Sequence, residues 1–389
     1  MNFDFDRIED RRVTDSVKWN VPEDVLPMWV ADMDFDTAPC VKEAVMRRAA
    51  RGVFGYTEIP SEWSDSICRW WRTRHGLDMQ PEWLVFCTGV LPALSSIVRK
   101  LTTPAEKVVV QTPVYNHFFS SILNNGRNVL ENPLIYRDGA YFMDFEDLEA
   151  KLADPQTSLF ILCNPHNPVG KIWDAGTLER IGELCARYRV TVVSDEIHCD
   201  LTDPGCSYVP FASVSPLCRS ISITCLAPTK TFNLAGLQTA AVCVPDPFLR
   251  HKVWRGLNTD EVAEPNAFAC VAATAAFREG GPWLDALRAY LYENKQMIRR
   301  RIAEEAPQLR VIGSEATYLL WIDCSALPGA ERFAEFLKEE AGLYVSDGGI
   351  YGAPGRAFLR VNAAAPRSLC EEGARRLCEG ARRFAQRAR

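Results

Sequence analysis

Short apolar segments alternate with longer amphipathic ones from about residue 80 onward, and this alternation restricts the fold more than any other feature of the chain. Residues 107–111, 158–163, 190–194 and 221–226 have the composition of buried strands. Between them lie helical patterns such as residues 178–187, where leucine and isoleucine recur at helical spacing. Strands that alternate with helices predict an α/β fold, in which helices cover both faces of a mostly parallel sheet.

The pattern changes after residue 281. Residues 283–306 have the periodicity of a long amphipathic helix, and residues 318–323 and 358–362 resemble strands. The helix expected at residues 367–389 is rich in arginine, and the solvated face of a packed helix explains this better than a nucleic-acid contact. We therefore expect a second, smaller α+β domain in this part of the chain.

The size of the chain is sufficient for more than one domain. Its 389 residues, 47% hydrophobic and 24% charged, allow two or three domains with large cores. We expect an N-terminal segment at residues 1–45 that packs with the small domain, a large domain at residues 46–280, and the small domain at residues 281–389.

Charge and hydropathy argue against several classes of protein. The formal net charge of -6 gives no electrostatic reason to expect nucleic-acid binding. No apolar run approaches the roughly 18 residues of a membrane span. The N-terminus lacks the basic start and apolar core of a secretory signal. We expect a cytoplasmic protein that binds neither nucleic acid nor membrane.

The cysteines and histidines suggest neither a disulfide framework nor a metal site. The 14 cysteines are scattered through strand-like and helix-like segments, without a CxxC pair, so we interpret them as free thiols in the core. The five histidines are isolated, and none forms an HxH or HExxH motif. We expect no metal.

Three polar segments follow three of the predicted strands. They are CNPHNPVG at residues 163–170, SDEIHCD at residues 194–200 and APTKTFN at residues 227–233. Each has a structural explanation when taken alone, as a turn, a helix cap or a lysine that reaches the surface. Ligands of parallel sheets bind at the carboxyl ends of the strands, so all three segments are expected at one site.

In this order, the three segments resemble the fold-type I enzymes that use pyridoxal 5'-phosphate, the class I and II aminotransferase superfamily. The resemblance extends over almost the whole chain and implies a seven-stranded, mostly parallel sheet in the large domain. It also implies that Lys230 holds the cofactor as a Schiff base, Asp195 pairs with the pyridine nitrogen, and Asn167 donates to the phenolate oxygen.

The chemistry of this cofactor agrees with those roles. An imine needs a neutral amine, and burial near a cationic ring lowers the pKa of a lysine such as Lys230. A carboxylate such as Asp195 at hydrogen-bond distance from a ring nitrogen gains roughly 6 kcal/mol at an effective dielectric of about 20. That interaction keeps the ring protonated, so the ring can accept electrons when the substrate loses its α-proton.

Further residues are expected to contact the cofactor. A strand leads into an apolar helix near residue 88, where the main-chain N–H groups of Gly89, Val90 and Leu91 could bind the phosphate at a helix N-terminus. The hydroxyl of Thr229 could also bind the phosphate. Tyr115 follows another strand and is expected to stack on the ring, with a core tyrosine as the alternative.

Arg360 lies within an apolar strand, where an unpaired charge would be costly. A guanidinium that binds a carboxylate with two parallel hydrogen bonds explains its position, and the resemblance implies that it binds the α-carboxylate of the substrate. An intramolecular ion pair is the alternative.

The N-terminal part narrows the resemblance. The motif PMWVADMDF at residues 27–35, followed by GYT at residues 55–57, is similar to the MalY/PatB class of cystathionine beta-lyases, the cystalysin-like carbon-sulfur lyases. That class implies a homodimer with shared active sites, in which the main chain of Ala31 lies near the substrate carboxylate and Tyr56 reaches the cofactor phosphate of the partner subunit. The alternative for this motif is a turn that packs on the core.

Three residues depart from the broader aminotransferase pattern. His198 replaces a tyrosine that binds the phenolate oxygen, so we count it among the cofactor contacts. Ala227 and Gln238 replace a serine and an arginine that bind the phosphate. The helix dipole, Thr229 and Tyr56 are then expected to neutralise more of the phosphate charge.

The resemblance implies a lyase that cleaves L-cystathionine or related cysteine S-conjugates to a thiol, pyruvate and ammonia, with Lys230 as general base. An aminotransferase would share the cofactor residues and is the first alternative. A transcription regulator with an aminotransferase-like sensor would need a DNA-binding domain, and the roughly 80 residues before the first core strand already match the lyase pattern.

Overall fold

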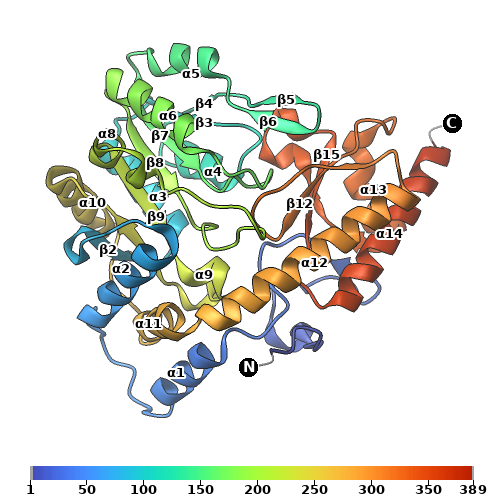
Figure 1. Ribbon diagram of the computed structural model, residues 1–389, viewed down its shortest axis with the longest axis horizontal. Helices are drawn as coiled ribbons and strands as arrows, with labels where there is room; N and C mark the ends of the chain where they lie inside the picture. Colours follow the sequence, from blue (N-terminus) through green and yellow to red (C-terminus); the bar gives the residue numbers. More distant parts are fainter. Residues whose placement is uncertain (1–2, 388–389) are drawn as a thin grey trace.

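A seven-stranded sheet forms the centre of the computed structural model, which describes residues 3–387 (Figure 1). The strands lie in the order β2-β10-β9-β8-β7-β3-β4. All neighbouring pairs are parallel except those that include β10. The expected seven-stranded, mostly parallel sheet is therefore confirmed. Its strands are β2 (Leu84–Cys87), β3 (Lys107–Val110), β4 (Asn128–Glu131), β7 (Thr157–Cys163), β8 (Thr191–Asp195), β9 (Ser222–Leu226) and β10 (Ala240–Cys243).

Helices cover both faces of this sheet, and this explains why its strands are continuously apolar. Val108 and Val110 of β3 pack into a core with α3 (Val90–Leu101), α4 (His117–Leu123) and α10 (Pro247–Thr259). Val109, between them in the sequence, faces the opposite core with α6 (Ala175–Arg187) and α7 (Phe211–Val214). Because successive side chains point to opposite faces, a strand covered on both sides needs apolar residues throughout.

The C-terminal part contains a second, antiparallel sheet. Its order is β11-β12-β15-β14, with β11 (Arg310–Val311), β12 (Leu319–Asp323), β14 (Ser346–Asp347) and β15 (Phe358–Asn362). The long helix predicted at residues 283–306 is α12 (Gly281–Glu305), and α13 (Phe333–Glu340) lies close by (Figure 1). The C-terminal helix α14 spans Arg367–Arg387, so the last two residues of that prediction lie outside the described range.

The N-terminal segment is connected to this C-terminal part by a short parallel pair. β1 (Leu26–Pro27) pairs with β13 (Leu343–Tyr344). α1 (Pro39–Ala49) then packs against α11 (Ala269–Glu279). The expected domain boundaries near residues 45 and 280 stay a prediction. No helix within residues 3–387 has both the length and the apolar character needed to cross a bilayer.

The register of the parallel strands brings the three polar segments to one edge of the sheet. Asp195 at the end of β8 lies opposite Cys163 at the end of β7 and opposite Cys225 near the end of β9. The chain segments that leave these strands are therefore neighbours in space.

Candidate active site

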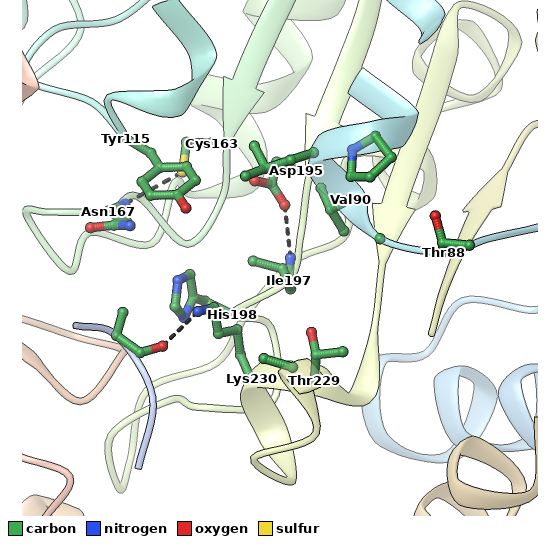
Figure 2. A pocket seen from close by; sticks show the side chains of 15 residues that line it. Thr88, Val90, Tyr115, Cys163, Asn167, Asp195, Ile197, His198, Thr229 and Lys230 are labelled. Carbon is green, nitrogen blue, oxygen red and sulfur yellow. Dashed lines mark hydrogen bonds between the residues drawn. The ribbon is translucent and has the colours of Figure 1, made fainter. Parts of the chain in front are cut away.

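A cavity of about 200 Å³ lies at the carboxyl ends of these strands (Figure 2). Most of the residues singled out from the sequence line it, although they come from six separate segments of the chain. They are Ala31, Gly89, Val90, Leu91, Tyr115, Asn167, Asp195, His198, Thr229 and Lys230. Two other residues from the same analysis, Arg360 and Tyr56, are not part of the lining.

Lys230 occupies the third position of the short helix α9 (Pro228–Thr231), directly after β9. Its amine donates a hydrogen bond of 2.5 Å to the main-chain oxygen of Ala31 (Figure 2). Burial, together with the positive charge of Arg360, lowers the pKa of the amine to about 8, against an opposing effect of Asp32 and Asp195. At pH 7 about a tenth of this amine is therefore neutral and nucleophilic, far more than for a lysine with an ordinary pKa.

Asp195 ends β8 and is almost completely buried. Within residues 3–387 one hydrogen bond reaches its carboxylate, from the main-chain N–H of Ile197 at 3.2 Å (Figure 2). Burial raises the pKa of Asp195 to about 7, although the Ile197 N–H and the charge of Lys230 oppose this shift. A cationic partner in the cavity would stabilise the ionised carboxylate.

Two aromatic side chains, those of Tyr115 and His198, line the same cavity (Figure 2). Burial, reinforced by the charges of Lys230 and Arg360, lowers the pKa of His198 to about 3, so its imidazole is neutral. Its buried Nδ1 has no hydrogen-bond partner within residues 3–387. Burial raises the pKa of Tyr115 to about 12, so the phenol stays protonated. Both rings are thus uncharged at neutral pH.

Arg360 lies behind the cavity on β15 and is 5% exposed. Its Nη1 donates to Asn167 Oδ1 at 3.3 Å, and its Nη2 donates to the main-chain oxygen of Trp29 at 2.8 Å. Its buried Nε has no partner among the described residues. No carboxylate within 4 Å neutralises this guanidinium in the part of the chain that the structure describes. The geometry therefore does not support the intramolecular ion pair considered as the alternative.

The N-terminus of α3 forms one end of the cavity. Gly89 is the N-cap, and the first N–H groups of a helix have no partner within it, so Val90 and Leu91 present free donors. Thr229 lies across the cavity (Figure 2). Among the described residues that line this cavity, Lys230 is the sole lysine or arginine, and the imidazole of His198 is neutral. The helix terminus is consequently the main source of positive potential for an anion there.

The segment at residues 28–35 crosses the site and is held by two asparagines. Asn362 donates to the main-chain oxygens of Val30 and Asp32, at 2.6 Å each. Asn233 accepts from the N–H of Met33 at 3.0 Å and donates to its oxygen at 2.9 Å. These bonds hold the intervening main chain of Ala31 against Lys230.

Tyr56 lies far more exposed than the other expected site residues. It belongs to the connection between α1 and α2 (Ser61–His75), which follows the outside of the fold in Figure 1. Val53, Phe54 and Ile59 of the same connection are also exposed. Tyr56 therefore does not reach the cavity of its own subunit.

Several residues of the site were missed by the sequence analysis. Cys163 and Ile197 line the cavity, and both lie within segments that were recognised, so their position next to Asn167 and Asp195 could have identified them. Tyr318 donates to the main-chain oxygen of Ala31 at 2.9 Å. No local motif marks this tyrosine, because its role depends on a contact with the distant N-terminal segment.

The residues present fit pyridoxal 5'-phosphate. Asp195 is a buried carboxyl with a single donor among the described residues, and it would gain a partner from a ring N–H. The buried Nδ1 of His198 has no partner among the described residues, which indicates that a polar group of a bound ligand would satisfy it. Lys230 offers an amine of lowered pKa, and the start of α3 offers main-chain donors for a phosphate. The donor set thus matches an aromatic cation with an aldehyde and a phosphate.

Comparison with known proteins gives a family match and close relatives. The family model described as aminotransferase class I and II matches residues 23–377. Cystathionine beta-lyase PatB of Bacillus subtilis is 44% identical, over 96% of this chain and 98% of its own length. Protein MalY of Escherichia coli is 34% identical, over 95% and 97%.

A solved structure is similar over almost the whole chain. Cystalysin from Treponema denticola, whose crystal structure contains a pyridoxal 5'-phosphate cofactor, is 31% identical with a TM-score of 0.95. The similarity covers 98% of this chain and 100% of cystalysin.

Proposed function

This chain belongs to the class I and II aminotransferase family, within which it is a pyridoxal phosphate-dependent carbon-sulfur β-lyase, and we propose that L-cystathionine and related cysteine S-conjugates are its substrates. The products would be a thiol, pyruvate and ammonia. One observation carries the chemistry: the amine of Lys230, with its pKa lowered to about 8, opens into the same cavity as the buried carboxyl of Asp195.

We assign the proton transfers to Lys230. Pyridoxal 5'-phosphate, when bound, supplies an electron sink for the pair left by the α-proton. The neutral Nζ of Lys230 takes that proton as general base and then becomes the nearest acid for the departing sulfur. The main-chain oxygen of Ala31 lies 2.5 Å from Nζ and accepts a hydrogen bond from it in either protonation state.

Arg360 would bind the α-carboxylate of the substrate. Its Nε lacks a partner within residues 3–387, and its Nη2 already donates to the Trp29 oxygen, so an incoming carboxylate would complete a partly used donor set. Asn167 fixes Nη1 at 3.3 Å and orients the guanidinium. The α-carboxylate of the substrate would thereby be placed relative to Lys230.

We also propose a homodimer in which Tyr56 of the partner subunit completes the phosphate end of the cavity. The support is the exposure of Tyr56 together with Val53, Phe54 and Ile59, a group of large apolar side chains on one connection. The described lining of the cavity contains few cationic side chains, so a hydroxyl from the partner subunit would add a needed donor for the phosphate. A cytoplasmic location is part of the proposal, supported by the fourteen free cysteines.

Incubation of the loaded enzyme with cystathionine, without any keto acid, tests the reaction type. A lyase releases pyruvate, ammonia and thiol over many turnovers, and these three products are measured. An aminotransferase stops after at most one equivalent, with the cofactor left in its amine form. The second outcome would contradict the proposal, because transamination needs a keto acid to regenerate the enzyme.

A further inference from the structure

The turn that carries Lys230 is too short to hold its own geometry. α9 spans four residues, and a single helical turn is unfavourable by itself, since several dihedral angles are fixed for one hydrogen bond. Contacts outside the turn must therefore position Lys230. Its neighbour Thr231 is fully buried and makes such a contact, because its hydroxyl donates to Asp200 Oδ2 at 2.9 Å.

This hydrogen bond joins two segments of the site. Asp200 and His198 belong to the loop that follows Asp195, the last residue of β8, whereas Thr231 belongs to the turn after β9. The Asp200–Thr231 contact consequently links the segment that presents Asp195 to the segment that presents Lys230.

Two donors from α2 hold the carboxylate of Asp200. The indole Nε1 of Trp70 and the Nε2 of His75 each lie 2.9 Å from Oδ1. Burial is the largest influence and raises the pKa of Asp200, but the hydrogen bond and charge of His75, with the bonds from Trp70 and Thr231, together lower it below its ordinary value. The carboxylate is therefore ionised and a strong acceptor for the Thr231 hydroxyl.

Asp200 does not line the cofactor cavity. It belongs to the wall of a separate polar cavity of about 550 Å³, together with His75, Thr202 and Arg288. His75, Cys199 and Asp200 also place possible metal-ligand atoms within 4.8 Å of one another. The hydrogen bonds from Trp70, His75 and Thr231 already occupy both oxygens of Asp200, which favours a structural link over a metal site.

We propose that Asp200 is a positioning residue for this reaction, which holds Lys230 in place relative to Asp195 through the hydroxyl of Thr231. The proposal rests on the lyase function given above. Since a misplacement of about 1 Å can lower a rate roughly 100-fold, the loss of this link should affect catalysis although Asp200 contacts neither substrate nor cofactor.

Substitutions of Thr231 test the link without the loss of a buried charge. Thr231→Val removes the hydroxyl at nearly constant volume, and Thr231→Ser keeps it. Thr239→Val is a matched control, because Thr239 is fully buried and its hydroxyl has no partner within residues 3–387. We expect Thr231→Val to lower kcat by roughly ten- to a hundredfold with little change in KM, as for an interaction that acts on the chemical step. Thr231→Ser and Thr239→Val should stay close to wild type.

A second measurement does not require turnover. The visible absorption of the cofactor-loaded protein can be titrated with pH in the absence of substrate. Its midpoint reports the proton affinity of the nitrogen through which Lys230 binds the cofactor. We expect Thr231→Val and Asp200→Asn to shift its midpoint, and Thr231→Ser to restore the wild-type midpoint. If Thr231→Val equals Thr239→Val in both kcat and midpoint, the positioning role is wrong. A wild-type protein without lyase activity would instead contradict the proposed function, while the spectral shift would still support the Asp200 link.

Discussion

The amine of Lys230 and the hydroxyl of Tyr318 both donate to the main-chain oxygen of Ala31, at 2.5 Å and 2.9 Å. Three regions distant in sequence thus meet at a single carbonyl group: the N-terminal segment, the turn after β9 and the start of β12. Because Asn362 binds the main chain on both sides of Ala31, at Val30 and Asp32, and Asn233 binds it at Met33, this oxygen is a fixed acceptor. The position of the amine therefore depends on the fold as a whole.

Covalent capture of pyridoxal 5'-phosphate by the cofactor-free protein should depend on pH through Lys230. Its amine has a pKa lowered to about 8, so the neutral fraction rises about tenfold between about pH 7 and pH 9 and then levels off. The rate at which visible absorption develops after mixing measures this. Lys230→Ala should show no such band, while Lys42→Ala, at an exposed lysine paired with Asp36, should behave as wild type. A capture rate that keeps rising about tenfold per pH unit between about pH 8 and pH 10 would contradict the role of burial, because an unperturbed lysine has a pKa of about 10.4.

Substitution of Asp195 should stabilise the cofactor-free protein at alkaline pH. The folded-state pKa of about 7 lies above the ordinary value of 3.8, so the stability linked to this carboxyl is full below about pH 4 and is lost as the pH rises through about 7. Asp195→Asn avoids the buried charge. We expect no difference from wild type at about pH 4 and a gain at about pH 8 of at most about 4 kcal/mol, since one pKa unit corresponds to about 1.4 kcal/mol.

Urea unfolding at the two pH values measures this difference. Asp138→Asn is the control, because this carboxyl is largely exposed. It should change the free energy of unfolding only slightly, and by the same amount at the two pH values. An Asp195→Asn protein that is less stable than wild type at about pH 8 would mean that the carboxylate is already paired in the cofactor-free fold.

Arg360→Lys should weaken substrate binding. A lysine cannot reproduce the planar pair of hydrogen bonds to a carboxylate, and the loss of a charge-assisted bond costs about 1.5–3 kcal/mol, which corresponds to a rise in KM of roughly ten- to a hundredfold. Steady-state kinetics with S-alkyl cysteines of different chain length should show the same factor throughout, because the α-carboxylate is common to all. Arg300→Lys, at an exposed arginine, serves as the control. An unchanged KM with a lower kcat would exclude the carboxylate contact.

Mixed dimers should reveal a shared site. We expect Tyr56→Ala and Lys230→Ala homodimers to be inactive or nearly so. In a mixed dimer, the Tyr56→Ala subunit keeps Lys230 and would receive Tyr56 from the partner subunit, so one site is complete. Co-refolding of equal amounts should recover about a quarter of the wild-type activity, because half of the dimers are then mixed and each contains one complete site. Fully active monomers in sedimentation experiments would contradict this arrangement.

The sheet and the residues at its edge could be predicted from local patterns. Residues such as Val108, Val109 and Val110 form an apolar run because a strand covered on both faces must be apolar throughout. Parallel strands also bring their carboxyl ends to one edge, so Asp195 and Lys230 were expected to be neighbours once both strands were recognised. Element limits differed from the structure by only a few residues, and the domain limits stay predictions.

The contacts that position these residues were decided only by the tertiary structure. Asp200 with Thr231, Tyr318 with Ala31, and Arg360 with Trp29 are each pairs from separate segments. A hydrogen bond of this kind leaves no periodicity in the sequence, since neither partner constrains its own neighbours. The same limit applies to the pKa of Lys230, which is lowered mainly by burial that more than one part of the chain provides. Residue identity thus determined which groups could react, whereas packing decided how each one is held and charged.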